Sequence, residues 1–293
     1  MKFERFTRSE GSSWALWEFN EHETQINNIY WASVASLSYS TYTVRNAPKH
    51  EDVPTILKAT GPNATRFPAN PKIWLTTTAT LQDWTRGSFV MAATGALERY
   101  VQRAVLTALL SDPALIYGKS RAIDGIAWLK LGINVDHAFV LDTVTIGKWP
   151  QRYSAFKKIF GEVPLVKHHL AILEEIREFR NDVGHAFGRD LSHKLISDTR
   201  SPQKMQKLKQ QRLIEWLGVM SEVAKALDEV LVANHIGDFE PMHYFYTWQQ
   251  KHRCTSTRSP QVEKEFRKAL GKEEGHSKGR SYVQELIAAY DAA

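Results

Sequence analysis

The sequence predicts an all-α protein, at least from residue 75 onwards. Between Leu81 and Leu110 the apolar residues recur three and four positions apart, which is the spacing of one face of a long helix. The same spacing returns in Leu165–Phe187 and in Leu213–Leu231. Proline or glycine follows several of these stretches, as Pro113 follows the first, and both residues end helices readily. A bundle of amphipathic helices is therefore the expected architecture.

The first 75 residues have a mixed pattern. Glu21–Leu37 carries apolar residues at helical spacing, so a helix is expected there. Tyr39–Val44 is rich in aromatic and β-branched residues and favours a short strand or an extended segment. Residues 46–72 contain five of the eleven prolines, which is typical of a loop. Residues 1–75 are therefore predicted to form an N-terminal segment of mixed structure.

Residues 76–235 are predicted to form one helical domain, and residues 236–293 a helical extension that follows it. Shorter helices are expected between the long ones, and a basic connection is expected from Arg189 to Arg212. The predicted helices from residue 76 onwards are Leu81–Leu110, Ala122–Leu131, Val135–Thr145, Gln151–Phe160, Leu165–Phe187, Leu213–Leu231 and Ser281–Tyr290.

Composition excludes several classes of protein. Hydrophobic residues make up 43% of the chain and charged residues 24%, as in a globular protein. No apolar stretch approaches the roughly 20 residues of a membrane-spanning helix, and Met1–Arg5 lacks the apolar region of a signal peptide. Cys254 is the only cysteine, so neither an internal disulfide nor a cysteine zinc site is expected. These features predict a cytoplasmic protein without a membrane partner, and the net charge of +6 moderately favours polyanionic partners.

The residues with the clearest chemical meaning lie at the C-terminal end of the predicted helix Leu165–Phe187. There the chain reads Arg180-Asn181-Asp182-Val183-Gly184-His185. At about 100° per residue, Asn181 and His185 share a helix face, whereas Arg180 is rotated from His185 by roughly 140°. That offset suits a site shared between two helices or two subunits, in which Arg180 of one copy approaches His185 of the other.

These residue types suit the cleavage of RNA. A histidine titrates near neutral pH and can take the proton from a ribose 2′-OH. An arginine offers forked donors that stabilise the charge developing on a phosphate. We therefore assign His185 as general base or acid, Arg180 as phosphate clamp and Asn181 as positioning residue. Gly184 has no side chain, so a phosphate or a partner helix can approach closely.

Residues 80–235 resemble a HEPN domain. Arg180-Asn181-x-x-x-His185 matches the R-x4-6-H signature of that family, an earlier long helix carries the acidic residue Glu98, and another long helix follows the motif. The resemblance implies a metal-independent endoribonuclease without a cofactor, acting as a homodimer and releasing a 2′,3′-cyclic phosphate. Glu98 and Asp182 would then be supporting residues.

The same resemblance implies a role in a toxin–antitoxin or anti-phage system, with an antitoxin or another regulatory protein as a partner. Many HEPN toxins carry a tyrosine two residues after the histidine, where a partner nucleotidyltransferase can modify it. This chain has Phe187 at that position, which argues against regulation by AMP transfer.

Other features are weaker indications of function. An aromatic run at Tyr244–Tyr246, together with Trp248, could stack bases, although aromatic runs more often form a core. His168 and His169 are adjacent and cannot both face one metal ion, so no metal site is expected. A basic run after the motif could follow an RNA backbone, although a solvated surface is its more ordinary explanation. That run consists of Arg200, Lys204, Lys207, Lys209 and Arg212.

Two alternatives remain open on the sequence. The first is a HEPN module without catalysis that binds a nucleotide or a protein partner, in which acids such as Glu98 or Asp182 would satisfy Arg180 and His185 internally. The second is a helical scaffold unrelated to HEPN domains, in which the motif would lie on the solvent face of a monomer.

Overall fold

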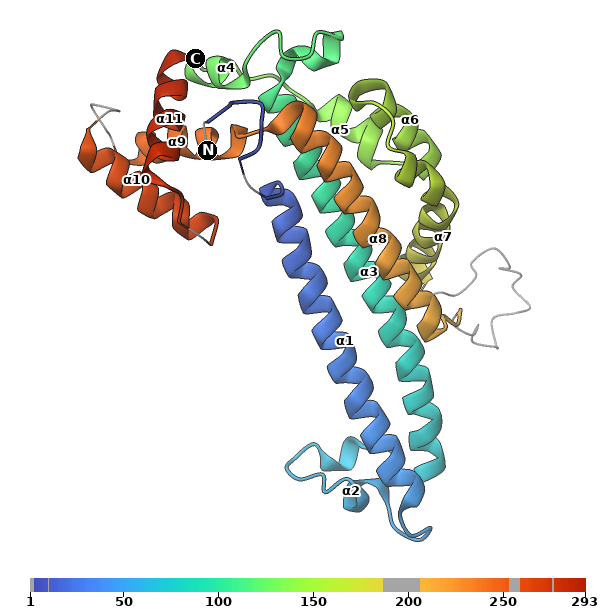
Figure 1. Cartoon of the computed structure of the whole chain (residues 1–293). Helices are drawn as coiled ribbons and strands as arrows, with labels where there is room; N and C mark the ends of the chain where they lie inside the picture. The colour runs from blue at the N-terminus through green and yellow to red at the C-terminus, as the bar shows by residue number, and fades with distance from the viewer. Residues whose placement is uncertain (1–2, 10, 187–205, 253–258, 276) are drawn as a thin grey trace. The chain divides into compact units, whose positions relative to one another are not determined.

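The computed structural model describes residues 3–9, 11–186, 206–252, 259–275 and 277–293 (Figure 1). Within these residues the chain is helical and contains no strand, which confirms the predicted all-α class. The α-helices are α1 (Trp14–Asn46), α2 (Val53–Ile56), α3 (Pro71–Ser111), α4 (Gly125–Lys130), α5 (Ala138–Thr145), α6 (Trp149–Phe160), α7 (Pro164–Ala186), α8 (Gln210–Leu231), α9 (Phe239–His252), α10 (Pro260–Glu273) and α11 (Arg280–Ala292). Short 3-10 or π turns occupy Ala64–Arg66, Pro113–Tyr117 and Val232–Ile236.

The strand or extended segment predicted at Tyr39–Val44 is wrong, because these residues continue α1. Two physical reasons explain the difference. The serine and threonine hydroxyls donate to carbonyl oxygens one turn earlier, as Thr43 Oγ1 does to the oxygen of Tyr39 at 2.9 Å, and so they are compatible with a helix. Val44 is also buried at 4% exposure, and such packing overrides the intrinsic preference of β-branched residues for strands.

Most other predicted helices are confirmed, with shifted ends. Helix α3 contains the predicted helix and ends at Ser111, before Pro113. Its start at Pro71 is earlier than predicted because Asn70 Oδ1 accepts from the backbone N of Lys72 at 2.8 Å and caps the first turn. Helices α9 and α10 were not predicted as separate helices from the sequence.

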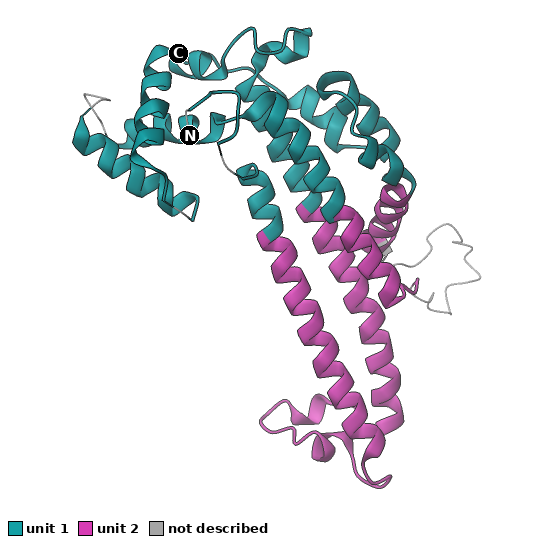
Figure 2. Cartoon of the chain, in the orientation of Figure 1, with its two compact units in different colours: residues 1–20, 97–171, 221–293 teal, residues 21–96, 172–220 magenta. Residues whose placement is uncertain are grey.

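The described chain divides into two compact units, each assembled from separate stretches of sequence (Figure 2). Unit 1 comprises residues 1–20, 97–171 and 221–293, and unit 2 comprises residues 21–96 and 172–220. None of the described helices is long and apolar enough to cross a membrane.

The core of unit 1 includes the aromatic run that the sequence singled out. Phe245 on α9 packs against Phe266 on α10 at 4.7 Å between ring centroids and against Tyr290 on α11 at 5.0 Å. Phe245 and Trp248 are buried. The prediction that aromatic residues of this run form a core is therefore confirmed for these two residues. Neither side chain is exposed for stacking on a base.

In unit 2, residues 21–46 of α1 and 71–96 of α3 lie side by side as an antiparallel helical hairpin (Figure 1). Tyr30 is buried in the hairpin and packs edge-on against Phe89, with ring centroids 5.2 Å apart. The unit 2 parts of α7 and α8 are joined by Phe179 and Trp216, whose ring centroids are 5.2 Å apart. This pair of helices holds the candidate site.

Candidate functional site

Helix α7 places the motif at its C-terminal end, as the sequence predicted. The apolar stripe is buried and includes Leu173, Ile176, Phe179 and Val183. Because this stripe fixes which side of α7 faces the core, the polar motif residues lie on the remaining sides of the helix. Phe187 lies outside the described residues.

The motif side chains differ in their surroundings. Arg180 is partly buried, and its Nη1 donates to Asn181 Oδ1 at 3.1 Å. His185 and Asp182 are exposed, and no described residue forms a hydrogen bond or ion pair with either side chain. Asn181 and His185 lie one turn apart on α7, as expected from their spacing. The imidazole of His185 is therefore accessible and lies one helical turn from Asn181, whose amide oxygen accepts a hydrogen bond from Arg180.

Gly184 is exposed, and its local packing does not require a glycine. A Cβ built there would meet Met91 Cε at 3.7 Å, an ordinary contact, and the residue lies inside the helix. Alanine would therefore fit. Helix formation gives no reason for this glycine, since alanine is favoured over glycine inside helices by about 1 kcal/mol.

The two acids predicted to support the site occupy different surroundings. Asp182 is exposed beside the motif. Glu98 belongs to unit 1, where its Oε1 lies 3.9 Å from Nη1 of the buried Arg152. Arg152 also lies over the Trp149 ring at 3.9 Å. The structure thus pairs Glu98 with Arg152 of α6 within unit 1.

Only part of the predicted basic run is described. Arg200 and Lys204 lie outside the described residues, whereas Lys207 and Lys209 are exposed. Arg212 forms ion pairs with Glu175 and, at 2.7 Å, with Glu215. The hydrogen bonds that its guanidinium donates, first to Glu215 and then to Glu175, raise the pKa of Arg212 above the ordinary value. Two carboxylates therefore balance the charge of Arg212, which leaves Lys207 and Lys209 as the exposed cations of this run among the described residues.

The described residues contain no group of three or more His, Cys, Asp or Glu side chains arranged to hold a metal ion. His168 and His169 lie with ring centroids 5.0 Å apart and the rings at 71°. His169 Nε2 lies 3.2 Å from Glu222 Oε2, within hydrogen-bond distance, so one of the two imidazoles has a carboxylate partner.

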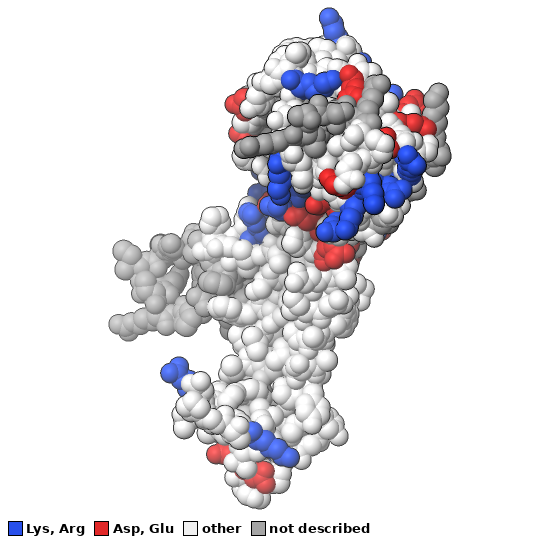
Figure 3. All heavy atoms as spheres, turned by 90° about the vertical axis from the view of Figure 1, so that its left-hand side faces the viewer, with Lys and Arg blue, Asp and Glu red and all other residues white. Residues whose placement is uncertain are grey.

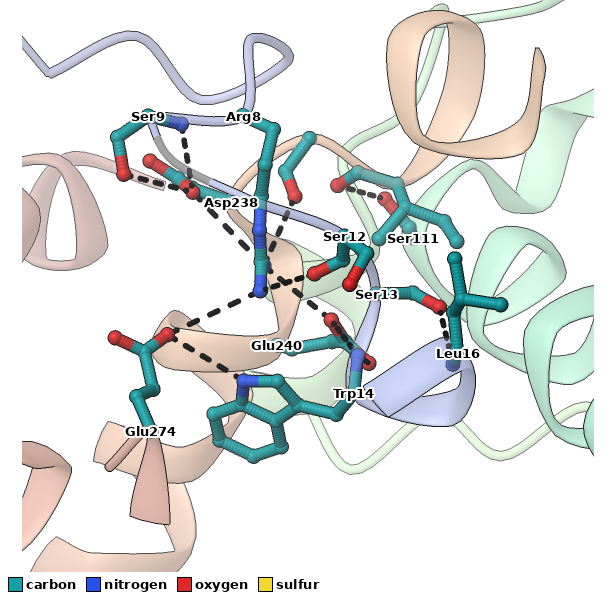
Figure 4. A network of polar contacts seen from close by, with 12 residues as sticks. Arg8, Ser9, Ser12, Ser13, Trp14, Leu16, Ser111, Asp238, Glu240 and Glu274 are labelled. Carbon is teal, nitrogen blue, oxygen red and sulfur yellow. Dashed lines mark hydrogen bonds and ion pairs between the residues drawn. The ribbon is translucent and has the colours of Figure 1, made fainter. Parts of the chain in front are cut away.

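Sequence reasoning missed a cluster of buried acids in unit 1 that anchors the N-terminal segment (Figure 4). The Arg8 guanidinium lies 3.2 Å from Glu240, and its other carboxylate neighbours are Asp238 and Glu274, both at 3.9 Å. The backbone N of Trp14 donates to Glu240 at 3.1 Å. No local pattern could have revealed this cluster, because Arg8 lies near the start of the chain and its carboxylate partners lie near the end.

Burial sets the protonation of this cluster. It raises the pKa of Glu240 to about 7, and the nearby Arg8 only partly offsets that effect. Burial also raises the pKa values of Asp228 and Asp238 above their ordinary range. Asp228 accepts from the backbone N of Ser13 at 3.0 Å, which ties the start of α1 to α8 within unit 1.

No protein-family model, no curated protein and no solved structure matches the chain.

Proposed function

We propose that the protein is a metal-independent endoribonuclease of the HEPN type that acts as a homodimer on RNA. His185 serves as general base or acid, Arg180 as phosphate clamp and Asn181 as positioning residue. The observation that carries the proposal is the end of α7, where Arg180 donates to Asn181 at 3.1 Å and the imidazole of His185 is exposed one turn away.

The proposed reaction uses only these groups and the RNA. His185 takes the proton from the ribose 2′-OH, and the 2′ oxygen attacks the adjacent phosphorus. The bond from phosphorus to the 5′ oxygen breaks, and the leaving 5′ oxygen takes the proton that the imidazole of His185 acquired from the 2′-OH, so no net proton is consumed. The products are a 2′,3′-cyclic phosphate and a 5′-hydroxyl. Arg180 stabilises the charge on the phosphoryl oxygens, and Asn181 fixes the guanidinium through their hydrogen bond.

The exposed Lys207 and Lys209 support an RNA substrate, because they add positive charge immediately before α8 in the same unit. A cytoplasmic location belongs to the same proposal and rests on the single cysteine. So does a role in toxin–antitoxin or anti-phage defence, with an antitoxin or regulatory partner, which rests on the resemblance to HEPN domains.

The test is cleavage of total RNA and of tRNA by the purified protein in excess EDTA. Arg180→Ala and His185→Ala are expected to reduce cleavage at least about a hundredfold, the range expected for loss of a proton-transfer or charge-stabilising group. His168→Ala is the matched control, because His168 is an exposed histidine on the same helix. Circular dichroism would verify that each variant keeps its helices.

Two results would count against the proposal. Cleavage that survives in both motif variants would show that the site is wrongly assigned. Absence of cleavage by the wild type on every RNA would favour the alternative, a HEPN module that binds a nucleotide or a protein without catalysis.

A further inference from the structure

Unit 1 contains a pocket of about 390 Å³ that is separate from the motif. Its walls come from the end of α3 and the turn after it, from α4 and the loop that follows α4, and from α9. All of these residues belong to the parts 97–171 and 221–293 of unit 1. Small molecules bind in protein pockets of roughly 300–1,000 Å³. The pocket therefore lies within one unit and has room for a small molecule.

Two glycines shape this pocket. A Cβ at Gly125 would lie 1.7 Å from the carbonyl oxygen of Leu110, so only glycine lets the start of α4 rest directly on the end of α3. Gly132 has a φ of 69°, in the left-handed region, and it turns the chain after α4. Ile133 and Val135 follow this turn and line the pocket. The backbone geometry thus fixes the walls.

The lining is apolar and carries no charge. Trp128 on α4 and Phe239 and Tyr246 on α9 contribute aromatic rings. No Lys, Arg, Asp or Glu occurs among the described residues that line the pocket. Charged side chains of unit 1 lie elsewhere, for example on the side that carries α10, where Figure 3 shows Lys and Arg gathered with Asp and Glu among them. A charged ligand would therefore meet no opposite charge in this pocket.

Two histidines interrupt the apolar lining, and neither has a polar partner among the described residues. His137, which precedes α5, is buried, and its Nδ1 has no hydrogen-bond partner there. His243 on α9 is half-buried, and no described residue forms a hydrogen bond or ion pair with its ring. Burial lowers the pKa of both imidazoles, and Asp136 offsets this only partly for His137. Both rings are therefore neutral near pH 7, and each has one donor and one acceptor nitrogen.

Packing alone does not explain these two histidines. A phenylalanine or leucine would fill the same space without removing ring nitrogens from water, which costs free energy when no hydrogen bond replaces the lost hydration. The buried nitrogen of His137 is Nδ1, so Nε2 is the nitrogen of that ring that a molecule in the pocket can reach. Apolar pockets that contain a few polar groups with shifted pKa values are typical of small-molecule sites.

We propose that this pocket binds an uncharged, planar heterocyclic molecule, which lies against the aromatic side chains and forms hydrogen bonds with His137 and His243. We call it the two-histidine pocket. Because no charged residue is described in its lining, it favours an uncharged ligand, and its aromatic rings favour a flat one that they contact by offset or edge-on stacking. A heterocycle with both a donor and an acceptor can pair with both neutral imidazoles.

The two-histidine pocket belongs to unit 1, whereas the motif Arg180–His185 belongs to unit 2. The proposal therefore does not depend on whether the motif cleaves RNA, and it is tested by binding alone.

The test is isothermal titration calorimetry of the full chain at pH 7.5 with three probes. Indazole is planar and uncharged, and it carries one N–H donor and one nitrogen acceptor. It is expected to bind one molecule per chain with a Kd of about 1 mM or below. Indazole-3-carboxylate adds a negative charge to the same ring, and cyclohexanol is uncharged but not planar. Each of these two is expected to bind at least about tenfold more weakly than indazole.

His137→Phe and His243→Phe test the two hydrogen-bonding residues, since each variant keeps a ring but removes its nitrogens. Each is expected to weaken indazole binding at least about fivefold, the effect of one lost hydrogen bond. His137→Phe should bind more weakly without being less stable in denaturant unfolding, because Nδ1 has no partner to lose. His168→Phe replaces an exposed histidine of unit 1 and is the control, which should bind as the wild type does.

Three results would overturn the proposal. A wild type that binds none of the probes with a Kd below about 10 mM would show that the pocket takes no such ligand. Cyclohexanol or the carboxylate binding as tightly as indazole would contradict an uncharged, planar ligand. Unchanged affinity in both phenylalanine variants, with their helices intact by circular dichroism, would show that the two histidines do not hold the probe.

Discussion

The carboxyl group of Glu240 is buried between Arg8 and the backbone N of Trp14, and its burial has a consequence for stability. A glutamate in an unfolded chain titrates near its ordinary value of 4.5, whereas in the folded protein the pKa of Glu240 is about 7. Between these two values the folded state binds more protons than the unfolded state. The free energy of unfolding therefore falls as pH rises through this interval and levels off above about 7.

Glu240→Gln is expected to remove this dependence, because the amide stays neutral and its oxygen can still accept from Trp14. The unfolding free energy of the variant minus that of the wild type should increase from pH 5 to pH 8, by on the order of 2–3 kcal/mol. Denaturant unfolding at several pH values measures it. The exposed Glu21→Gln is the control and should show no such trend. A Glu240→Gln difference that does not change with pH would show that the carboxyl titrates as in the unfolded chain.

The contacts of Glu240 with Arg8 and Trp14 were not predictable from the sequence, whereas the relative positions of the motif residues were. Arg180, Asn181 and His185 are close in sequence, so helix geometry alone gives their relative directions. Arg8 and Glu240 come together only because unit 1 combines the first residues of the chain with the last helices. Likewise, the pairing of Arg212 with Glu175 depends on how α7 packs against α8. A basic run in the sequence gives no information about such partners.

Within helix α7, a substitution at Gly184 allows an effect on protein stability to be separated from an effect on RNA cleavage. Gly184→Ala is expected to raise the free energy of unfolding by about 0.5–1 kcal/mol, because alanine is the better helix former and the added methyl meets only Met91. If a phosphate approaches the backbone at this point, RNA cleavage should fall several-fold in the more stable variant. Denaturant unfolding and the cleavage assay measure the two effects.

The matched control is Gly218→Ala on α8, where the glycine is also exposed and an added Cβ meets nothing within 4 Å. It should gain similar stability and keep full cleavage. Equal activity of both variants and the wild type would contradict a close approach of RNA at Gly184, while leaving the roles of Arg180 and His185 to their own test.

Helices with a clear apolar stripe were predicted within a few residues of their ends, as α7 and α8 show. The prediction failed at Tyr39–Val44, where β-branched and aromatic residues suggested an extended chain. The same segment carries no charged residue. Propensity describes the isolated segment, whereas the packing of α1 against α3 determines its structure.

At the scale of the whole molecule, periodicity locates helices along the chain but does not tell which of them share a core. Helices α1, α3, α7 and α8 each contribute residues to both units. A prediction made segment by segment has no means of finding such a division. The oligomeric state is a further property of the whole molecule. The rotation of Arg180 from His185 by roughly 140° around α7 suits a site shared between two copies of the chain.

If each active site takes Arg180 from one copy and His185 from the other, two inactive variants should complement each other. A dimer of one Arg180→Ala copy and one His185→Ala copy would contain one site with both residues intact and one site with neither. Random mixing makes about half of the dimers of this mixed kind. The mixture is therefore expected to recover about a quarter of the wild-type cleavage, although each variant alone is inactive.

The same mixture separates the two sources of a negative result. If both residues must come from one copy, mixed dimers contain no complete site, and activity stays at the level of the separate variants. If the chain forms no dimer, sedimentation reports this independently of cleavage.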